Sequence, residues 1–91
     1  MSCILLKVYG MVQGVSFRYY ARQKAEELGL KGWARNCTDQ TVEIMVCGEE
    51  EDLNSFTAWA KKGPTYAHVE KIENQSVDSR AATQLTDFII E

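Results

Sequence analysis

The chain has 91 residues, of which 45% are hydrophobic and 25% are charged, and its net charge is -3. This length leaves room for a single domain, residues 1–91, around one hydrophobic core. No apolar run approaches the roughly 20 residues of a membrane span, and the N-terminal segment lacks the basic leader of a signal peptide. We therefore expect a cytoplasmic protein without membrane contacts.

The three cysteines and the single histidine form no metal-binding pattern. An odd number of cysteines without C-x-x-C spacing is typical of a reducing compartment and argues against a disulfide framework. Cys3 and Cys47 are candidates for neighbours across two strands, and we expect them to pack there as small buried thiols. We also expect no metal ion and no cofactor.

The charge is unevenly distributed along the chain. Residues 7–36 carry a net charge of +4, whereas the remaining residues carry -7. A local positive field on an acidic body suits the capture of a small anion better than the binding of a polyanion, so we expect a small-molecule partner and no nucleic acid. The alternative is a chance clustering of charges on solvated faces.

Hydrophobic periodicity predicts the elements of the first half of the chain. A glycine-bracketed loop is expected at residues 10–16, and a tight turn at Asp39-Gln40. The regular elements expected around them are strands at residues 3–9, 31–38 and 41–47 and a helix at residues 17–28.

The second half begins with a helix at residues 49–62, whose acids lie at the start and lysines at the end, as the helix dipole favours. A strand at residues 66–73, a polar loop at residues 74–83 and a short strand at residues 87–91 follow. The order βαββαβ with a terminal strand indicates an α+β fold, the ferredoxin-like split βαβ sandwich, with two helices on one face of an antiparallel sheet.

The loop at residues 10–18, GMVQGVSFR, carries the most chemical information. Its two glycines let the backbone turn tightly and bring N–H groups close to a ligand. The loop ends at a helix N-terminus, which favours an anion, and Arg18 adds a guanidinium fork that can grip two phosphate oxygens. The alternative is a plain connecting loop with a surface arginine.

Asn36 is the second residue of interest. It follows Gly32-Trp33-Ala34-Arg35 on the second strand, and alternation places it on the sheet face opposite Trp33 and Arg35. Asparagine is disfavoured within strands, and its amide can hold a water by accepting one hydrogen bond and donating another. The alternative is an exposed asparagine that leads into the following turn.

These two segments resemble the signature of the acylphosphatases, a G-x-V-Q-G-V-x-F-R loop and a later G-W/Y-V/A-x-N strand. The resemblance continues at Gly63-Pro64 and at Phe88-x-Ile90, so it spans essentially the whole chain. Two positions depart from the family pattern, since Met11 stands where a basic residue is usual and Gln40 where a glycine is usual.

The resemblance implies a metal-independent hydrolase that cleaves the carboxyl–phosphate bond of acyl phosphates without a cofactor. It implies that Arg18 binds the phosphoryl group together with the loop backbone, and that Asn36 orients the attacking water. The implied substrate-binding residues are Gln13, Gly14, Val15, Ser16, Phe17 and Arg18. We expect the enzyme to act as a monomer on a small acyl phosphate.

Two other classes of protein compete with this interpretation. A binding module would use the same loop to hold a small anion or a phosphoprotein without turnover, but would have no use for Asn36. An RNA-recognition domain of the same fold would carry aromatic residues on the open faces of its central strands. Those faces here hold one aromatic residue, Tyr9, which disfavours RNA binding.

Overall fold

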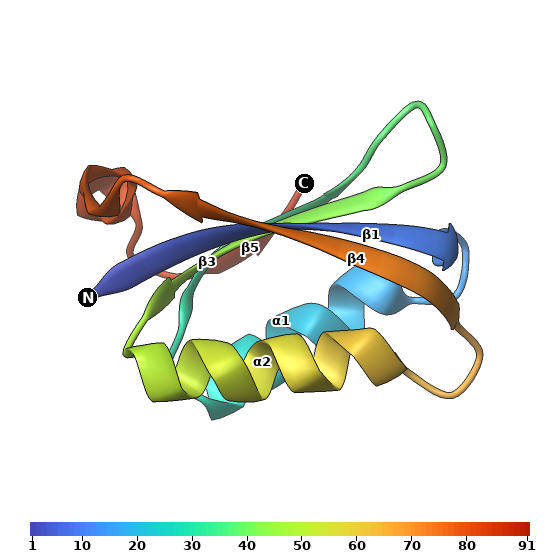
Figure 1. Ribbon diagram of the computed structural model, residues 1–91, viewed down its shortest axis with the longest axis horizontal. Coiled ribbons are helices and arrows are strands. Elements are labelled where there is room, and N and C mark those ends of the chain that lie inside the picture. The colour runs from blue at the N-terminus through green and yellow to red at the C-terminus, as the bar shows by residue number, and fades with distance from the viewer.

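The computed structural model describes all residues from 1 to 91, arranged as a five-stranded sheet with two α-helices on one face (Figure 1). The strands are β1 (Ser2–Met11), β2 (Lys31–Asn36), β3 (Val42–Gly48), β4 (His68–Val77) and β5 (Phe88–Ile90). The helices are α1 (Phe17–Glu27), α2 (Glu50–Lys62) and the 3-10 helix η1 (Ser79–Gln84). None of these helices has the length and hydropathy needed to cross a bilayer.

The strand order is β4-β1-β3-β2-β5, and the ferredoxin-like α+β fold predicted from the sequence is confirmed. The sheet is antiparallel as predicted except at one edge, where the short terminal strand β5 pairs with β2 in parallel. The other pairs are antiparallel. The direction of β5 follows from the topology, since β4 runs opposite to β2 and a single chain reversal through η1 sends β5 back along β2.

The hydrophobic core lies between the sheet and the two α-helices. Helix α1 covers β2 and β5, whereas α2 covers β4, β1 and β3. Alternation along the strands turns every second side chain toward the helices, as the sequence predicts. The buried cluster consists of Leu6, Val8, Val12, Phe17, Ala21, Ala25, Leu30, Ala34, Val42, Ile44, Val46, Leu53, Phe56, Ala60 and Phe88.

Strand β1 runs two residues further than the hydrophobic alternation predicts. Gly10 and Met11 still pair with β4, beyond an irregularity in register after Tyr9. A Cβ atom on Gly10 would lie 2.1 Å from the carbonyl oxygen of His68, and the φ of Gly10 is 127°. Glycine at this position therefore serves the close approach of two strands, and the connecting loop begins only at Val12.

The polar loop expected at residues 74–83 is also wrong. Strand β4 begins at His68, later than predicted, and continues to Val77, which pairs with Cys3 of β1. As an edge strand with exposed polar side chains, β4 shows no alternation, and main-chain pairing alone extends it. The chain then forms η1, at whose start the Asp78 side chain accepts a hydrogen bond from the backbone N–H of Arg80.

The expectation of two separate thiols at Cys3 and Cys47 is wrong. The two residues are direct partners in the register of β1 and β3, their Cα atoms are 4.1 Å apart, and they form a disulfide bond. Both side chains face away from the α-helices yet are buried, and η1 packs against β1 on this side. Cys37 remains as the free cysteine.

Strand β2 ends at Asn36, two residues earlier than predicted, and a turn at residues 37–41 leads into β3. Gln40 adopts a φ of 73° in this turn. That is the left-handed region that glycine favours, so the departure from the family pattern at Gln40 leaves the turn in a conformation suited to glycine. Asn36 is therefore the last residue of β2, and it is exposed there.

Candidate active site

The loop between β1 and α1 has the backbone geometry of an anion-binding nest. Gly14 and Ser16 have φ angles of 74° and 63°, whereas Val15 between them has an ordinary φ. Left-handed residues that alternate with ordinary ones turn successive N–H groups toward the same side of the chain. The sequence predicted this role for the glycine, but not the left-handed conformation of Ser16.

The N-terminus of α1 is left open toward this loop. Ser16 occupies the N-cap position without a side-chain hydrogen bond, and the first turn contains no acidic residue. The first turn of α2, in contrast, holds Glu50, Glu51 and Asp52, which offset its own dipole. The unpaired N–H groups and the positive end of the α1 dipole are therefore available to an external anion.

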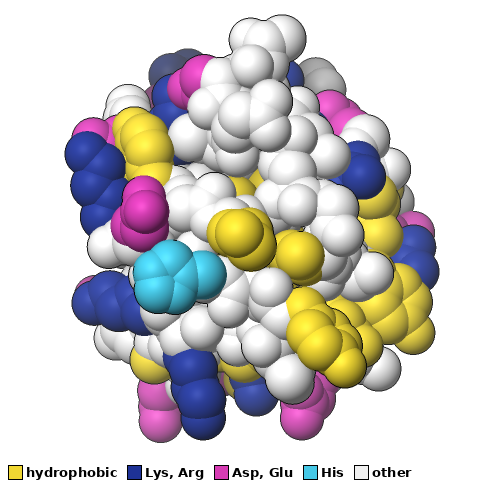
Figure 2. All heavy atoms as spheres, turned by 90° about the vertical axis from the view of Figure 1, so that its right-hand side faces the viewer, with side chains coloured by type: hydrophobic (Ala, Val, Ile, Leu, Met, Phe, Trp, Pro, Cys, Tyr) yellow, Lys and Arg dark blue, Asp and Glu magenta, His cyan; other side chains and the backbone are white.

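A cavity of about 370 Å³ lies at this end of the molecule. Its lining residues are Val12, Gly14, Ser16, Phe17, Arg18, Tyr19, Asn36 and Ile90. Arg18 and Asn36 come from different elements, α1 and β2, and the fold brings them to one cavity. On this side of the protein, the largest group of hydrophobic side chains reaches from the middle of the surface to its right-hand edge, with Lys and Arg side chains around it (Figure 2).

Asn36 lies on the helix-covered side of the sheet. It has the same parity along β2 as the buried Ala34, and the opposite parity to Trp33 and Arg35. The guanidinium of Arg35 lies 4.8 Å from the Trp33 ring centroid and binds Glu43, which fixes both side chains on the other face. The amide of Asn36 is thus directed toward the layer that contains the N-terminus of α1.

The guanidinium of Arg18 is held by the chain segment that follows β5. Its Nη1 atom donates a hydrogen bond to the backbone oxygen of Glu91. The backbone N–H of Glu91 in turn donates to the carbonyl oxygen of Ala34, at 2.8 Å. Because Ala34 lies two residues before Asn36 on β2, this chain of contacts ties the arginine to the strand that carries the asparagine.

Two of the predicted substrate-binding residues do not line the cavity. Gln13 instead directs its side chain to the turn after β2, where its Nε2 atom donates to the carbonyl oxygens of Cys37 and Thr41 at 2.8 and 2.9 Å. Val15 packs against the hydrophobic core. Gly14, Ser16, Phe17 and Arg18 do line it.

Three lining residues were missed by the sequence reasoning. Val12 was counted as part of the loop without a role, although it lies next to the nest. Tyr19 follows Arg18 directly in the predicted helix, and no sequence pattern assigns it a role at the cavity. The pairing of Phe88 and Ile90 on one face of β5 was visible in the sequence, but Ile90 reaches the cavity only because β5 pairs with β2.

The turn beside Asn36 is fixed by Asp39. Its Oδ1 atom accepts hydrogen bonds from the backbone N–H and the hydroxyl of Thr41, at 3.2 and 2.5 Å, and its Oδ2 atom lies 3.0 Å from Nζ of Lys7. The Thr41 hydroxyl, followed by Lys7, lowers the pKa of Asp39 from 3.8 to about 2. The hydrogen bond between Lys7 and Asp39 in turn raises the pKa of Lys7.

No group of three or more His, Cys, Asp or Glu side chains is placed to hold a metal ion. The polar groups that the cavity presents to a ligand are main-chain N–H groups, one guanidinium and one side-chain amide. The fold and the cavity together define a ferredoxin-like domain with an anion-binding nest at a helix N-terminus.

Comparisons with known proteins give this class a family. The family model described as "Acylphosphatase" matches residues 4–90. A protein named "Acylphosphatase" from Thiobacillus denitrificans is 47% identical over 80% of this chain and 82% of its own, and one from Aeromonas hydrophila is 44% identical over 76% and 77%. The crystal structure of acylphosphatase from Bacillus subtilis superposes with a TM-score of 0.92 and 34% identity, over 100% of this chain and 99% of that one. The chain belongs to the acylphosphatase family.

Proposed function

We propose that this protein is an acylphosphatase that hydrolyses acyl phosphates to a carboxylate and inorganic phosphate in the cavity shared by Arg18 and Asn36. One observation carries the proposal. In a chain of the acylphosphatase family, the fold brings a guanidinium and a side-chain amide to the cavity at the open N-terminus of α1.

The first step is the binding of the phosphoryl group. The N–H groups of the loop at residues 12–16 and of the first turn of α1 surround it, and the guanidinium of Arg18 neutralises its charge. These donors are fixed before the substrate arrives, so they stabilise charge on the equatorial oxygens of the transition state without reorganising. Arg18 is therefore both the binding and the charge-stabilising residue.

The second step is the attack of water. The amide of Asn36 accepts one hydrogen bond from the water and donates another to it, which aims the water oxygen at phosphorus. An amide takes up no proton near neutral pH, so the proton of the water passes to a phosphoryl oxygen or to solvent. Asn36 contributes orientation, which can recover several kcal/mol of the barrier.

The third step is the departure of the acyl group. The leaving group is a carboxylate, whose conjugate acid has a pKa of roughly 4, so it departs without a proton donor. An ordinary phosphate ester expels a much more basic alkoxide and calls for an acid or a metal ion. The donor set of the cavity therefore suits acyl phosphates, and we propose that the reaction needs no metal and no cofactor.

The test is the hydrolysis of acetyl phosphate and benzoyl phosphate in the presence of a chelator. The wild-type protein should hydrolyse both. Arg18→Ala should lose turnover by about 10²–10³-fold and should no longer be inhibited by inorganic phosphate. Asn36→Ala should lose turnover by about 10²-fold while phosphate still inhibits it, because the nest and Arg18 remain.

Matched controls for these variants lie far from the cavity. Arg80→Ala removes the same charge from η1, and Asn54→Ala removes an amide from α2; both should retain activity. Inhibition of the Arg18 variant by phosphate as strong as that of wild type would contradict the binding role. A wild-type protein that binds phosphate but hydrolyses neither substrate would instead be a binding module.

A cytoplasmic location and a monomeric state complete the proposal. Both points follow from the proposed substrate. A small acyl phosphate as the sole partner in the reaction requires neither a membrane nor a second subunit. Light scattering of the purified protein and fractionation of cells that express it test these two points.

A further inference from the structure

A second cavity, a groove of about 430 Å³, lies between the two α-helices on the outside of the helical layer. Its lining residues are Tyr20, Gln23, Lys24, Glu27, Trp59, Pro64, Thr65 and Tyr66. None of them lines the candidate active site, and those on α1 lie about half a helical turn around the axis from Arg18. A function of this groove is therefore separate from the proposed hydrolysis.

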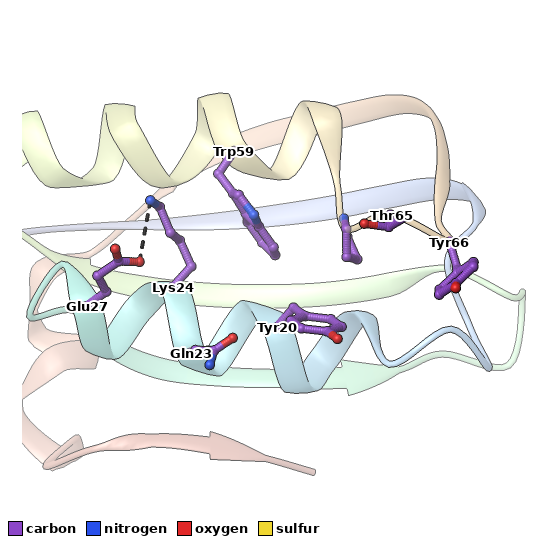
Figure 3. Close-up of a pocket in the computed structure, with 8 residues that line it drawn as sticks. Tyr20, Gln23, Lys24, Glu27, Trp59, Thr65 and Tyr66 are labelled. Carbon is purple, nitrogen blue, oxygen red and sulfur yellow. Dashed lines mark ion pairs between the residues drawn. The ribbon is translucent and has the colours of Figure 1, made fainter.

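The groove has an aromatic end and an acidic end, because α1 and α2 run in opposite directions (Figure 1). Tyr20 and Tyr66 lie toward the end where α2 stops, Trp59 projects from α2 between the helices, and Glu27 lies at the other end (Figure 3). The first turn of α2 begins at that same end and contains Glu50, Glu51 and Asp52. A ligand along the groove thus meets aromatic rings first and carboxylates last.

The three aromatic side chains of the groove each present a free hydrogen-bond donor. The side-chain hydrogen bonds within the chain involve neither the indole N–H of Trp59 nor the hydroxyls of Tyr20 and Tyr66. No buried side-chain donor lacks a partner, so these three donors face the solvent. The groove therefore combines apolar ring faces with donors at the ring edges.

The rings on the two helices are held in place by other aromatic side chains. Trp59 packs against Phe17 and Phe56, with ring centroids 5.6 Å apart in both pairs. Tyr20 meets Tyr19 edge to face, with centroids 5.2 Å apart. Rings that are fixed before a ligand arrives lose little conformational freedom on binding, and a stiff ligand keeps the entropic cost low on its own side as well.

A proline-rich segment in the polyproline II conformation is a stiff ligand that matches this wall. The conformation has no internal hydrogen bonds, so its carbonyl oxygens are free to accept from the ring-edge donors. Proline has no N–H group, so the segment asks for few acceptors in return, and its rings pack on aromatic faces. A helical ligand would satisfy its own carbonyl oxygens, and an extended strand would require a sheet edge.

We propose that the groove between α1 and α2 binds a proline-rich segment of a partner protein, with a basic residue of that segment at the Glu27 end. Charge complementarity carries the second part. Glu27 pairs with Lys24 at 3.5 Å, but its side chain is 66% exposed, so its carboxylate can also bind a cation of the ligand. The exposed rings carry the first part, since Tyr66 is 81% and Tyr20 is 42% exposed.

The test is the titration of the purified protein with an octaproline peptide preceded by two lysines. The chain has two tryptophans, so a Trp33→Phe background leaves Trp59 as the fluorescent reporter of the groove. The peptide should change this fluorescence in a saturable way, and isothermal titration calorimetry should give the same Kd with wild type.

Two groove variants test the two parts of the proposal. Tyr66→Ser should raise the Kd by about two- to tenfold, the effect of losing one aromatic contact. Glu27→Gln should raise the Kd of the lysine-flanked peptide by about two- to fivefold and leave that of octaproline without lysines unchanged.

Matched controls separate the groove from other effects. A peptide with the same two lysines and alternating glycine and serine keeps the charge but is a flexible coil, and it should not bind. Tyr9→Ser removes a ring on the sheet face opposite the helices, since Tyr9 alternates with the buried Val8, and it should leave the Kd unchanged. Circular dichroism verifies that both tyrosine variants are folded.

Saturable binding that needs the prolines and is weakened by Tyr66→Ser but not by Tyr9→Ser supports the docking groove. The absence of heat and of a fluorescence change up to about 1 mM peptide overturns it, as does binding that Tyr66→Ser leaves unaltered. An equal effect of Glu27→Gln on both proline peptides overturns the part assigned to the basic residue. Acetyl phosphate hydrolysis by Tyr66→Ser should match wild type, so none of these outcomes bears on the proposed enzymatic activity.

Discussion

Gln13 connects the loop at residues 12–16 to the turn that follows Asn36, the residue that we propose to orient the water. Its main chain belongs to the loop, and the two hydrogens of its Nε2 atom reach the carbonyl oxygens of Cys37 and Thr41. Cys37 directly follows Asn36, so this single amide sets the spacing between the nest and Asn36. We expect Gln13 to be a positioning residue, because its side chain lines no part of the cavity.

Gln13→Met tests this role, since methionine has a similar shape and no donor. We expect kcat to fall by about tenfold, because a displacement of the water-orienting amide by about 1 Å can cost up to 10²-fold. Inhibition by inorganic phosphate should change little, since the nest and Arg18 are untouched. The loss of two hydrogen bonds to partly buried carbonyls should lower the free energy of unfolding by about 1–3 kcal/mol.

The test compares the change in kcat with the change in the free energy of unfolding. A merely structural role would lower stability and leave kcat unchanged at temperatures where the variant is folded. Thermal unfolding together with steady-state kinetics at such a temperature decides between the two.

The sequence singles out Arg18 and Asn36, which the structure brings to one cavity, and for Arg18 the reason is local. Arg18 follows a loop with two glycines and lies at a helix start, and the chemistry of an anion site depends on just such neighbouring residues. The role of the Gln13 side chain could not be predicted. The side chain binds a turn that lies more than twenty residues further along the chain, and no local sequence pattern indicates such a contact.

At the scale of elements, the turn at residues 37–41 shows how a charged side chain stabilises a loop. Asp39 accepts two hydrogen bonds from Thr41, which is buried, and pairs with Lys7 on the interior strand β1. The turn is therefore tied to the sheet from two sides, by Asp39 and by Gln13. Both attachments hold the end of β2 at which Asn36 stands.

This arrangement predicts a stability that depends on pH through Asp39. The folded-state pKa of about 2 lies below the usual 3.8, so the carboxylate stabilises the fold fully above pH 3.8 and loses this contribution as the pH falls toward about 2. Asp39→Asn should therefore have a lower Tm than wild type near neutral pH, with a difference that shrinks toward about pH 2.

Thermal unfolding of the two proteins between about pH 5 and about pH 2 checks this. Glu70→Gln on the edge strand β4 is the matched control, because Glu70 is exposed, lies outside any helix and forms no ion pair. A difference in Tm that stays constant over this range would show that the carboxylate of Asp39 contributes through shape and not through charge.

Elements that bury an alternating or helical face could be predicted closely, as for β3 and α1, whose bounds differ from the prediction by at most one residue at each end. Elements held by main-chain pairing alone could not. The second half of β4 carries polar side chains at an edge, and η1 has no buried residue, so neither leaves a hydrophobic period to detect. The parallel pairing of β5 with β2 depends on the path of the whole chain. Hydrophobic periodicity predicts a strand there but not its direction or its partner.

At the scale of the whole molecule, the candidate active site and the disulfide lie at opposite ends of β1. Strand β1 runs from the N-terminus on one side of the molecule to the loop before α1 on the other (Figure 1). The disulfide lies where β1 begins, and the cavity lies where it ends. From Cys3 to Met11 the strand spans about 26 Å at about 3.3 Å per residue. The bond between Cys3 and Cys47 joins β1 to β3, so it encloses α1 and β2, the elements that carry Arg18 and Asn36.

Reduction of this disulfide should therefore lower stability without lowering activity. The bond closes a loop across a sequence separation of 44 residues, and such cross-links typically contribute about 2–4 kcal/mol by restricting the unfolded chain. For a domain of this size that corresponds to a fall in Tm of roughly 10–25 °C. In a reducing cytoplasm the protein would work in this less stable form.

Calorimetry and acetyl phosphate hydrolysis, each with and without a phosphine reductant, measure the two quantities separately. The variant with alanine at both Cys3 and Cys47 should be at least as unstable as the reduced protein and should not respond to the reductant. Cys37→Ser, which removes the free thiol, should keep the full difference in Tm between the oxidised and reduced forms. If the reduced protein at a temperature where it is folded loses turnover, then the two ends of β1 are coupled, and the rigid strand between them transmits the change to Arg18 and Asn36.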